Sequence, residues 1–240
     1  MHQFEISRIL ELQIAGFDVS FTNSSAWMMV TVIAASLFLT LSVRSRALVP
    51  GKAQMIAEIA YEFVAGMMRD TVGNDGQKFF PFVFTLFIFI LACNMFGMLP
   101  YSFTPTSHII VTFAMAAFVF VGVTLIGIFK HGFRFLSLFV PSGVPMALLP
   151  IIIVIEVISY LSRPISLSVR LFANMMAGHT MLKVFAGFIV GMGFVTGGFV
   201  PFLFAVALTG LEILVAFLQA YVFAVLTCIY LNDALHLHDH

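Results

Sequence analysis

Charged side chains are scarce in this sequence. Asp, Glu, Lys and Arg make up only 9% of its 240 residues, whereas roughly 25% is usual for a soluble domain. So few charges cannot cover a globular surface that faces water. Hydrophobic residues make up 61% of the chain, and 29 of them are Phe. The composition therefore excludes soluble, disordered and disulfide-rich secreted proteins, and it indicates a chain embedded in membrane lipid.

Net charge and cysteine are equally limited. The formal net charge is zero, so the chain has no excess of positive charge with which to bind the phosphates of nucleic acid. The two cysteines, Cys93 and Cys228, lie in apolar runs, where a thiol usually serves as a small hydrophobic side chain. The sequence therefore predicts neither a nucleic-acid partner nor a bound metal or cofactor.

Long apolar runs predict five membrane-spanning helices. Each run is long enough to cross the hydrocarbon core of a bilayer, and charged, proline-containing or glycine-rich turns separate one run from the next. The predicted spans are residues 26–49, 79–98, 109–129, a long stretch at 146–190 and a second long stretch at 202–231.

Two further segments complete the predicted organisation. Charged and apolar side chains are interleaved with a helical period over residues 52–70, which is typical of an amphipathic helix that lies at the membrane surface. Residues 1–25 are expected to form an amphipathic or irregular lead-in. Since the sequence has no internal repeat or linker, it predicts an all-α polytopic membrane protein with a single membrane domain, 1–240.

The short basic loops predict the orientation. Arg44, Arg46 and Lys52 follow the first span, and Lys130 and Arg134 follow the third. Short loops rich in Lys and Arg face the cytoplasm. With five spans, the amino terminus then lies outside and the carboxyl terminus in the cytoplasm.

Ionisable residues occur inside the fourth predicted span, where each costs ~2.5–3.5 kcal/mol at the centre of a membrane helix. Glu156, Arg163 and Arg170 are seven residues apart, a spacing that puts all three on one stripe of a helix. Asn174 extends this stripe by one turn. His179 comes nine residues after Arg170, about 180° around the helix, and is expected to face a different neighbour.

The fifth span carries a similar pattern. Glu212 and Gln219 are one heptad apart, and Tyr230 falls close to the same face. Polar groups at several depths favour aqueous cavities that enter from both sides of the membrane. Arg170 stays protonated at any working pH, so it can attract a carboxylate but cannot join a proton relay. His179 and Glu212 could also pair across the helices merely to satisfy each other.

Structural alternatives exist for the other candidates as well. Arg163 lies just before Pro164 and Lys183 lies near the far end of the fourth span, and their long basic side chains could simply reach opposite membrane interfaces. Glu156 could neutralise Arg163 in a structural pair. Asn94 could serve either as a helix-packing hydrogen bond or as a group that lines a channel.

The segment RPISLSVRLFANMMAGH, from Arg163 to His179, resembles the signature of subunit a of the F-type ATP synthase. The resemblance extends over nearly the whole chain, through the surface helix at 52–70, the stretch Asn94–Pro100 and the polar pattern of the last span. It implies a non-catalytic stator that carries protons between two offset half-channels. The implied partners are a ring of c subunits that turns against the two long tilted carboxy-terminal helices, the peripheral-stalk b subunits and the other synthase subunits. The implied location is the bacterial plasma (inner) membrane.

The resemblance also implies roles for individual positions. Arg170 matches the essential arginine that faces the c-ring carboxylate, and Asn174 and Gln219 match polar groups beside it. His179 and Glu212 match residues of the outer half-channel, and Glu156 matches an acid of the cytoplasmic half-channel. The chain differs from some relatives, which exchange the Glu and His of the outer pair or carry an acid at the position of Gly97.

Two other classes of protein also place polar groups inside a membrane. A proton-coupled secondary transporter is the main alternative, but such transporters usually contain paired repeats with broken helices, which this sequence lacks. An intramembrane hydrolase is disfavoured because neither an H-E-x-x-H nor a G-x-S-x-G motif occurs.

Overall fold

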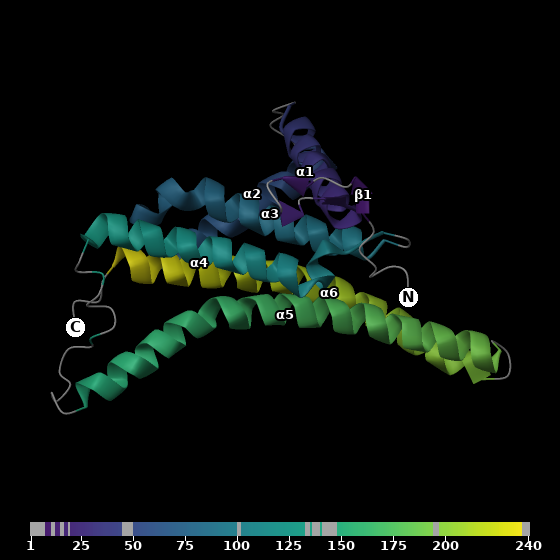
Figure 1. Ribbon diagram of the computed structural model, residues 1–240. Helices are drawn as coiled ribbons and strands as arrows, with labels where there is room; N and C mark the ends of the chain where they lie inside the picture. The colour runs from purple at the N-terminus through teal and green to yellow at the C-terminus, as the bar shows by residue number, and fades with distance from the viewer. Residues whose placement is uncertain are drawn as a thin grey trace.

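The computed structural model describes residues 8–10, 13–14, 17–18, 20–44, 50–99, 102–132, 135, 140, 148–193 and 197–236. Six α-helices dominate this part of the chain (Figure 1). They are α1 Asn23–Ser42, α2 Lys52–Val72, α3 Phe80–Gly97, α4 Ile109–His131, α5 Leu149–Met192 and α6 Phe199–Leu235. Two short 3₁₀ helices, η2 Asn74–Phe79 and η3 Pro105–Ser107, precede α3 and α4. Every α-helix except α2 is long and apolar enough to cross a membrane, so the predicted all-α polytopic fold is confirmed.

Short strands precede the first helix. β1 Arg8–Leu10 pairs with β4 Phe21–Thr22, and β2 Gln13–Ile14 pairs with β3 Phe17–Asp18, both antiparallel. The hydroxyl oxygen of Thr22 then accepts a hydrogen bond from the backbone N–H of Ser25 at 3.4 Å, which caps the amino terminus of α1. The sequence did not predict these pairings because strands of two or three residues show no measurable periodicity.

Helix α2 buries one face only. Its buried residues recur at helical spacing and pack in a region where α2 contacts α3 and α6; they are Ala57, Val64, Met67, Met68 and Val72. The charged side chains Glu58, Glu62, Arg69 and Asp70 remain exposed. This two-sided distribution is the amphipathic helix that the sequence predicted.

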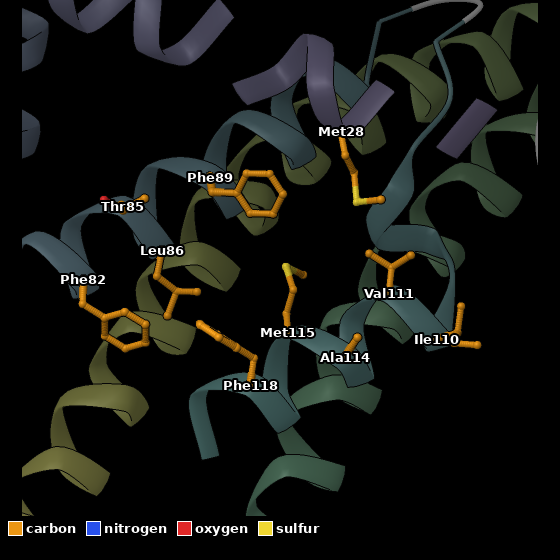
Figure 2. Close-up of a pocket in the computed structure, with 10 residues that line it drawn as sticks. All are labelled: Met28, Phe82, Thr85, Leu86, Phe89, Ile110, Val111, Ala114, Met115 and Phe118. Carbon is orange, nitrogen blue, oxygen red and sulfur yellow. The ribbon is translucent and has the colours of Figure 1, made fainter. Parts of the chain in front are cut away.

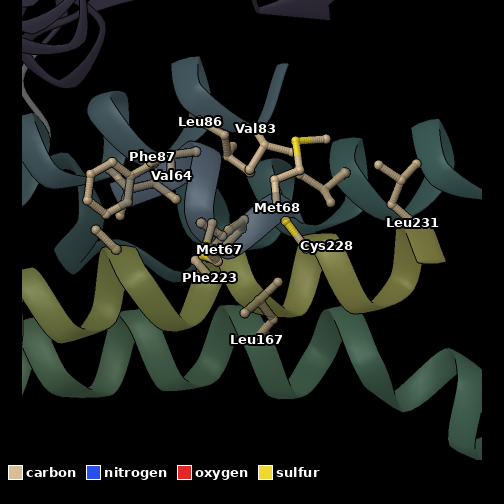
Figure 3. Packing of buried hydrophobic residues seen from close by; sticks show 14 of the residues in the cluster. Val64, Met67, Met68, Val83, Leu86, Phe87, Leu167, Phe223, Cys228 and Leu231 are labelled. Atoms are coloured by element: carbon tan, nitrogen blue, oxygen red, sulfur yellow. The ribbon is translucent and has the colours of Figure 1, made fainter. Parts of the chain in front are cut away.

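Helix α6 is the central element, since α2, α3, α4 and α5 all contact it. Four small residues, spaced four apart, form a fully buried stripe along it: Ala216, Ala220, Ala224 and Cys228. In lipid no hydrophobic effect drives helices together, so close packing of small residues supplies much of the association. Figure 3 shows Phe223 and Cys228 of α6 meeting side chains from neighbouring helices, Leu167 of α5 among them.

Helix α5 spans 44 residues and curves along its length (Figure 1). Its carboxy-terminal part runs beside α6, whereas its amino-terminal end diverges from α6. Pro164 lies inside α5. A proline removes one backbone hydrogen bond and crowds the preceding turn, and it therefore bends a helix.

The connection between α3 and α4 folds back into the protein. Its residues Ser102–Ser107 are all buried, and η3 contacts α1, α3, α4 and α5. The hydroxyl of Ser102 donates to the carbonyl of Phe96 at 2.7 Å, and the hydroxyl of Thr104 donates to the carbonyl of Gly97 at 3.0 Å. These bonds supply partners to the last carbonyls of α3, of which that of Phe96 also accepts from the backbone N–H of Leu99 at 3.1 Å. Gly97 is required because a Cβ atom there would collide with the side chain of Thr104.

A cavity of about 620 Å³ lies between α3 and α4, and Met28 of α1 also lines it (Figure 2). Its lining is apolar, with Phe82, Phe89, Met115 and Phe118 among the side chains that surround it. Thr85 supplies the polar side chain of this lining, and its hydroxyl donates to the carbonyl of Pro81 in its own helix at 2.7 Å. No acidic, basic or imidazole side chain lines this cavity, so it offers no group for proton transfer.

Replacing Ala220 with Leu should separate α6 from its neighbours. Overpacking a filled interior typically costs ~1–3 kcal/mol, and Ala220 has no exposed surface. We expect Ala220→Leu to lower the thermal unfolding temperature of the purified subunit in detergent. Ala207→Leu adds the same side chain at an exposed position of α6 and should leave this temperature unchanged. Equal stabilities of the two variants would contradict the small-residue packing of α6.

Candidate functional site

Arg170 lies near the middle of α5 and is exposed. Its neighbours Leu167, Ser168 and Leu171 are buried, and the hydroxyl of Ser168 donates to the carbonyl of Ile165 in its own helix at 2.9 Å, so the buried side of this part of α5 offers Arg170 no counter-charge. Within the described part of the chain, no hydrogen bond or ion pair joins Arg170 to another side chain. The guanidinium group therefore has no counter-charge from the described residues.

A hydrogen bond links α5 to α6 one turn after Arg170. The side-chain amide of Asn174 donates to Oε1 of Gln219 at 2.8 Å. Gln219 is buried, and its Nε2 atom has no hydrogen-bond partner among the described residues. The structure thus brings together the two neutral polar residues that the sequence analysis placed near Arg170.

His179 and Glu212 also meet between α5 and α6. Nδ1 of His179 lies 3.5 Å from Oε1 of Glu212, and the Glu212 side chain is buried. Gly178 makes this approach possible, because a Cβ atom there would lie 2.8 Å from the same carboxylate oxygen. On its other side, the imidazole reaches the turn before α4, where Nε2 lies 3.0 Å from the hydroxyl oxygen of Thr104.

A cavity of about 250 Å³ lies between α5 and α6 beside these residues. Asn174, Gly178 and Glu212 line it together with apolar side chains. One small space therefore borders both the polar link beside Arg170 and the pair formed by His179 and Glu212.

A second polar cluster joins the amino-terminal part of α5 to the end of α6. Arg163 donates to the carboxylate of Asp233 at 2.9 Å. Its guanidinium carbon also lies 5.3 Å from the ring centre of Tyr160 and 5.1 Å from that of Tyr230, which adds cation–π attraction from both rings. Arg163 thus pairs with Asp233 and not with Glu156, which lies two turns earlier on α5 and is half-buried.

Asn94 and Lys183, the remaining sequence candidates, have different surroundings. Asn94 is fully buried; its amide donates to the carbonyl of Ala216 at 3.2 Å and its oxygen accepts from the hydroxyl of Thr106 at 2.9 Å. Asn94 therefore makes a hydrogen bond between packed helices, which is one of the two roles considered for it in the sequence analysis. Lys183 is exposed and lies one turn beyond His179.

Sequence reasoning missed Asp233, Tyr160, Gly178 and Thr104, which belong to these clusters. Asp233 lies 21 residues after Glu212, which is three heptads and hence close to the same face of α6. It was overlooked because the predicted fifth span ends at residue 231. Gly178 and Thr104 carry no periodic signal. Thr104 meets His179 across 75 residues of chain, a contact that only the tertiary fold creates.

His108 lies at the end of the same buried turn, immediately before α4. Its ring stacks on Phe103 with the ring centres 4.9 Å apart. The Nε2 atom is buried and has no hydrogen-bond partner among the described residues. Burial lowers the pKa of His108 below the ordinary value for histidine.

The fold and these clusters define a polytopic helical membrane protein with ionisable residues inside its spans, the class that includes proton and ion transporters. Residues 25–232 match the family model described as ATP synthase A chain. The chain is 61% identical to ATP synthase subunit a of Pelagibacter ubique, over 99% of this chain and 98% of the relative. It is 60% identical to that of Chelativorans sp., over 98% and 97%, and 59% identical to that of Rhizobium meliloti, over 100% and 98%. The chain therefore belongs to the ATP synthase subunit a family, as the sequence resemblance implied.

Lowering the pH should loosen the turn that contains His108. Burial lowers the pKa of His108 in the folded chain. His108 therefore binds a proton more tightly once the turn has opened. The stability that neutral His108 contributes is present above about pH 6.5 and declines as the pH falls below this value. Amide hydrogen exchange of residues 102–108, corrected for its intrinsic pH dependence, should accelerate on acidification. His108→Phe keeps an aromatic ring without the titration and should remove the effect; an unchanged pH dependence would contradict this account.

Proposed function

We propose that this chain is the proton-translocating stator subunit of an ATP synthase and makes no covalent change itself. Its membership of the subunit a family supports this assignment. In this proposal it lies in the bacterial plasma (inner) membrane with its amino terminus outside and its carboxyl terminus in the cytoplasm. It holds a rotating ring of c subunits on one side and is anchored by the peripheral-stalk b subunits.

The unpaired Arg170 is the observation that carries the proposal. A charged side chain at the centre of a membrane helix costs at least ~2.5–3.5 kcal/mol. The chain pairs Arg163 with Asp233 and places His179 beside Glu212, yet no described acidic side chain pairs with Arg170. We infer that the counter-charge comes from another chain, as a carboxylate on the c ring.

Two half-channels then lie on opposite sides of Arg170. His179 is nine residues after Arg170 and Glu156 is fourteen residues before it, so they lie ~14 Å and ~21 Å away along α5. In the proposal, Glu212 and His179 belong to the outer half-channel and Glu156 to the cytoplasmic one.

The cycle follows from the cost of charge in lipid. A proton that enters from outside is carried by Glu212 and His179 to a ring carboxylate. The carboxylate becomes neutral and can then turn into the lipid without the free-energy cost of a buried charge. After the ring has turned, the carboxyl group reaches the Glu156 cavity and releases the proton. Arg170 then attracts the carboxylate and favours its ionised form. The membrane potential supplies ~2.3 kcal/mol per proton for every 100 mV.

Arg170 also separates the two half-channels. Its guanidinium remains protonated, so a proton cannot pass along it from one side to the other. Asn174 and Gln219 hold α5 and α6 together beside this charge, and Arg163 with Tyr230 holds them together nearer the end of α6. These contacts fix the position of Arg170 against the ring.

Arg170→Ala should abolish coupled ATP synthesis while the complex still assembles. Without the positive charge, the ring carboxylate loses its counter-charge and the barrier between the half-channels is lost. We expect the synthesis rate in vesicles energised by an imposed potential to fall by at least about tenfold, equivalent to ~1.4 kcal/mol. Arg44→Ala removes the same side chain just after α1 and serves as the matched control. Retained synthesis in Arg170→Ala would contradict the proposed role of Arg170 as counter-charge and barrier.

Exchanging His179 and Glu212 should be tolerated better than replacing either residue alone. Their side chains face each other across α5 and α6, so the exchanged pair keeps one imidazole and one carboxyl group at the same place. We expect His179→Glu with Glu212→His to retain more ATP-driven proton pumping than either single substitution, in a double-mutant comparison. If the double variant pumps no better than the single ones, the two residues do not act as a pair.

A further inference from the structure

Thr104 occupies a position between two helices that the sequence analysis did not single out. It is buried in the turn between α3 and α4. Its hydroxyl oxygen lies 3.0 Å from the carbonyl oxygen of Gly97 and 3.0 Å from Nε2 of His179. A threonine hydroxyl has a single hydrogen, so it can donate to only one of these atoms. The carbonyl oxygen can only accept, whereas Nε2 of His179 can either accept or donate.

The end of α3 determines where that hydrogen goes. Three carbonyl oxygens there, those of Phe96, Gly97 and Leu99, lie within reach of the hydroxyls of Ser102 and Thr104. Ser102 approaches Phe96 and Leu99 at 2.7 Å and Gly97 only at 3.1 Å. A carbonyl can only accept, and a buried carbonyl without a partner is costly. The carbonyls of Phe96 and Leu99 already accept from the backbone N–H groups of Leu99 and Ser102, both at 3.1 Å, whereas no described backbone N–H bonds to the carbonyl of Gly97. The hydrogen of Thr104 is therefore best used on Gly97.

We propose that Thr104 is a positioning residue that holds His179 with its hydrogen on Nε2 and leaves Nδ1 to exchange a proton with Glu212. In this arrangement Nε2–H donates to the Thr104 hydroxyl oxygen. Nδ1, which lies 3.5 Å from Oε1 of Glu212, then carries the lone pair. This inference rests on the proposed function, because it gives the outer half-channel its proton-accepting atom.

The proton transfer is balanced in this arrangement. A proton moves from the carboxyl group of Glu212 to Nδ1 of His179 and produces a carboxylate and an imidazolium; the reverse step restores both neutral groups. The Nε2–H bond to Thr104 is unchanged throughout, so the imidazole need not rotate. In the other tautomer Nδ1 already carries a hydrogen and cannot accept the proton. Thr104 would then have to donate to Nε2, and the carbonyl of Gly97 would lose this bond.

Two other features of the structure support this role. Gly97 and Gly178 clear the space that Thr104 and Glu212 occupy, since a Cβ atom at either glycine would collide with those side chains. The charged groups near His179 are Glu212 on α6 and Lys183 on its own helix. The Thr104 hydroxyl on the opposite side is neutral, so it can set the tautomer without adding charge to the pair.

Thr104→Val tests the proposal because Val has nearly the same shape but can neither donate nor accept a hydrogen bond. In the assembled synthase we expect Thr104→Val to lower ATP-driven proton pumping by at least about tenfold and to displace the pH at which pumping is half-maximal. Thr104→Ser keeps the hydroxyl and should restore both quantities to near the native values. Thr112→Val is the matched control, since Thr112 is equally buried and bonds only to carbonyls in or next to its own helix turn.

A spectroscopic measurement remains decisive if Thr104→Val fails to assemble. Solid-state ¹⁵N NMR of ring-labelled histidine in the native assembled complex reports which nitrogen carries the hydrogen, and the signal absent from His179→Gln identifies His179. We expect Nε2 protonated and Nδ1 bare at neutral pH. Protonation on Nδ1, or equal pumping and pH profiles in Thr104→Val and Thr104→Ser, would overturn the inference. Neither result would affect the proposed role of Arg170, whose loss is measured independently through ATP synthesis.

Discussion

The free-energy cost of an ionisable group inside lipid governs the arrangement of α5 and α6. Each such group needs either a partner or water. Arg163 has a carboxylate and two aromatic rings, and Glu212 lies beside His179. Arg170 has no such partner among the described residues, although it lies near the middle of the longest helix. Arg163 is paired within the described part of the chain and Arg170 is not. The unpaired charge is best explained by a counter-charge on another chain.

Close packing makes these polar contacts possible. The small residues Ala216, Ala220 and Ala224 leave room for neighbouring helices beside α6, and Gly178 leaves room for the carboxyl group of Glu212. The buried turn before α4 depends in the same way on Gly97. Close approach lets a buried polar group meet a polar partner in the protein, which lipid tails cannot supply. The buried polar contacts therefore depend on the small residues beside them.

Much of the fold was predictable from the sequence because lipid imposes a simple pattern. Apolar runs long enough to span a bilayer identified the five membrane helices, and the interleaved charges of residues 52–70 identified the amphipathic α2. Heptad spacing likewise placed Glu212 and Gln219 on one face of α6. These predictions depend only on contacts along a single helix and on the solvent around it.

The missing parts depend on contacts between distant segments. Thr104 meets His179 only after the turn between α3 and α4 has folded inward, and no local pattern distinguishes it from the other hydroxyl residues of that turn. Asp233 was missed because the polar composition of the last residues concealed the continuation of α6 to Leu235. The short strands before α1 were missed because pairing over two or three residues depends on turn geometry more than on composition.

Passive proton flux tests the central claim most directly. It would be measured under an imposed potential across membranes that contain the assembled synthase, first without ADP, when the coupled ring cannot turn, and then with ADP and phosphate, with native protein compared against Arg170→Ala. If Arg170 is the barrier between two half-channels, the variant should conduct protons without turning the ring and should therefore leak faster than the native protein, while coupled synthesis is lost. Coupled flux equal to that of the native protein would contradict the account and return Arg170 to a structural role.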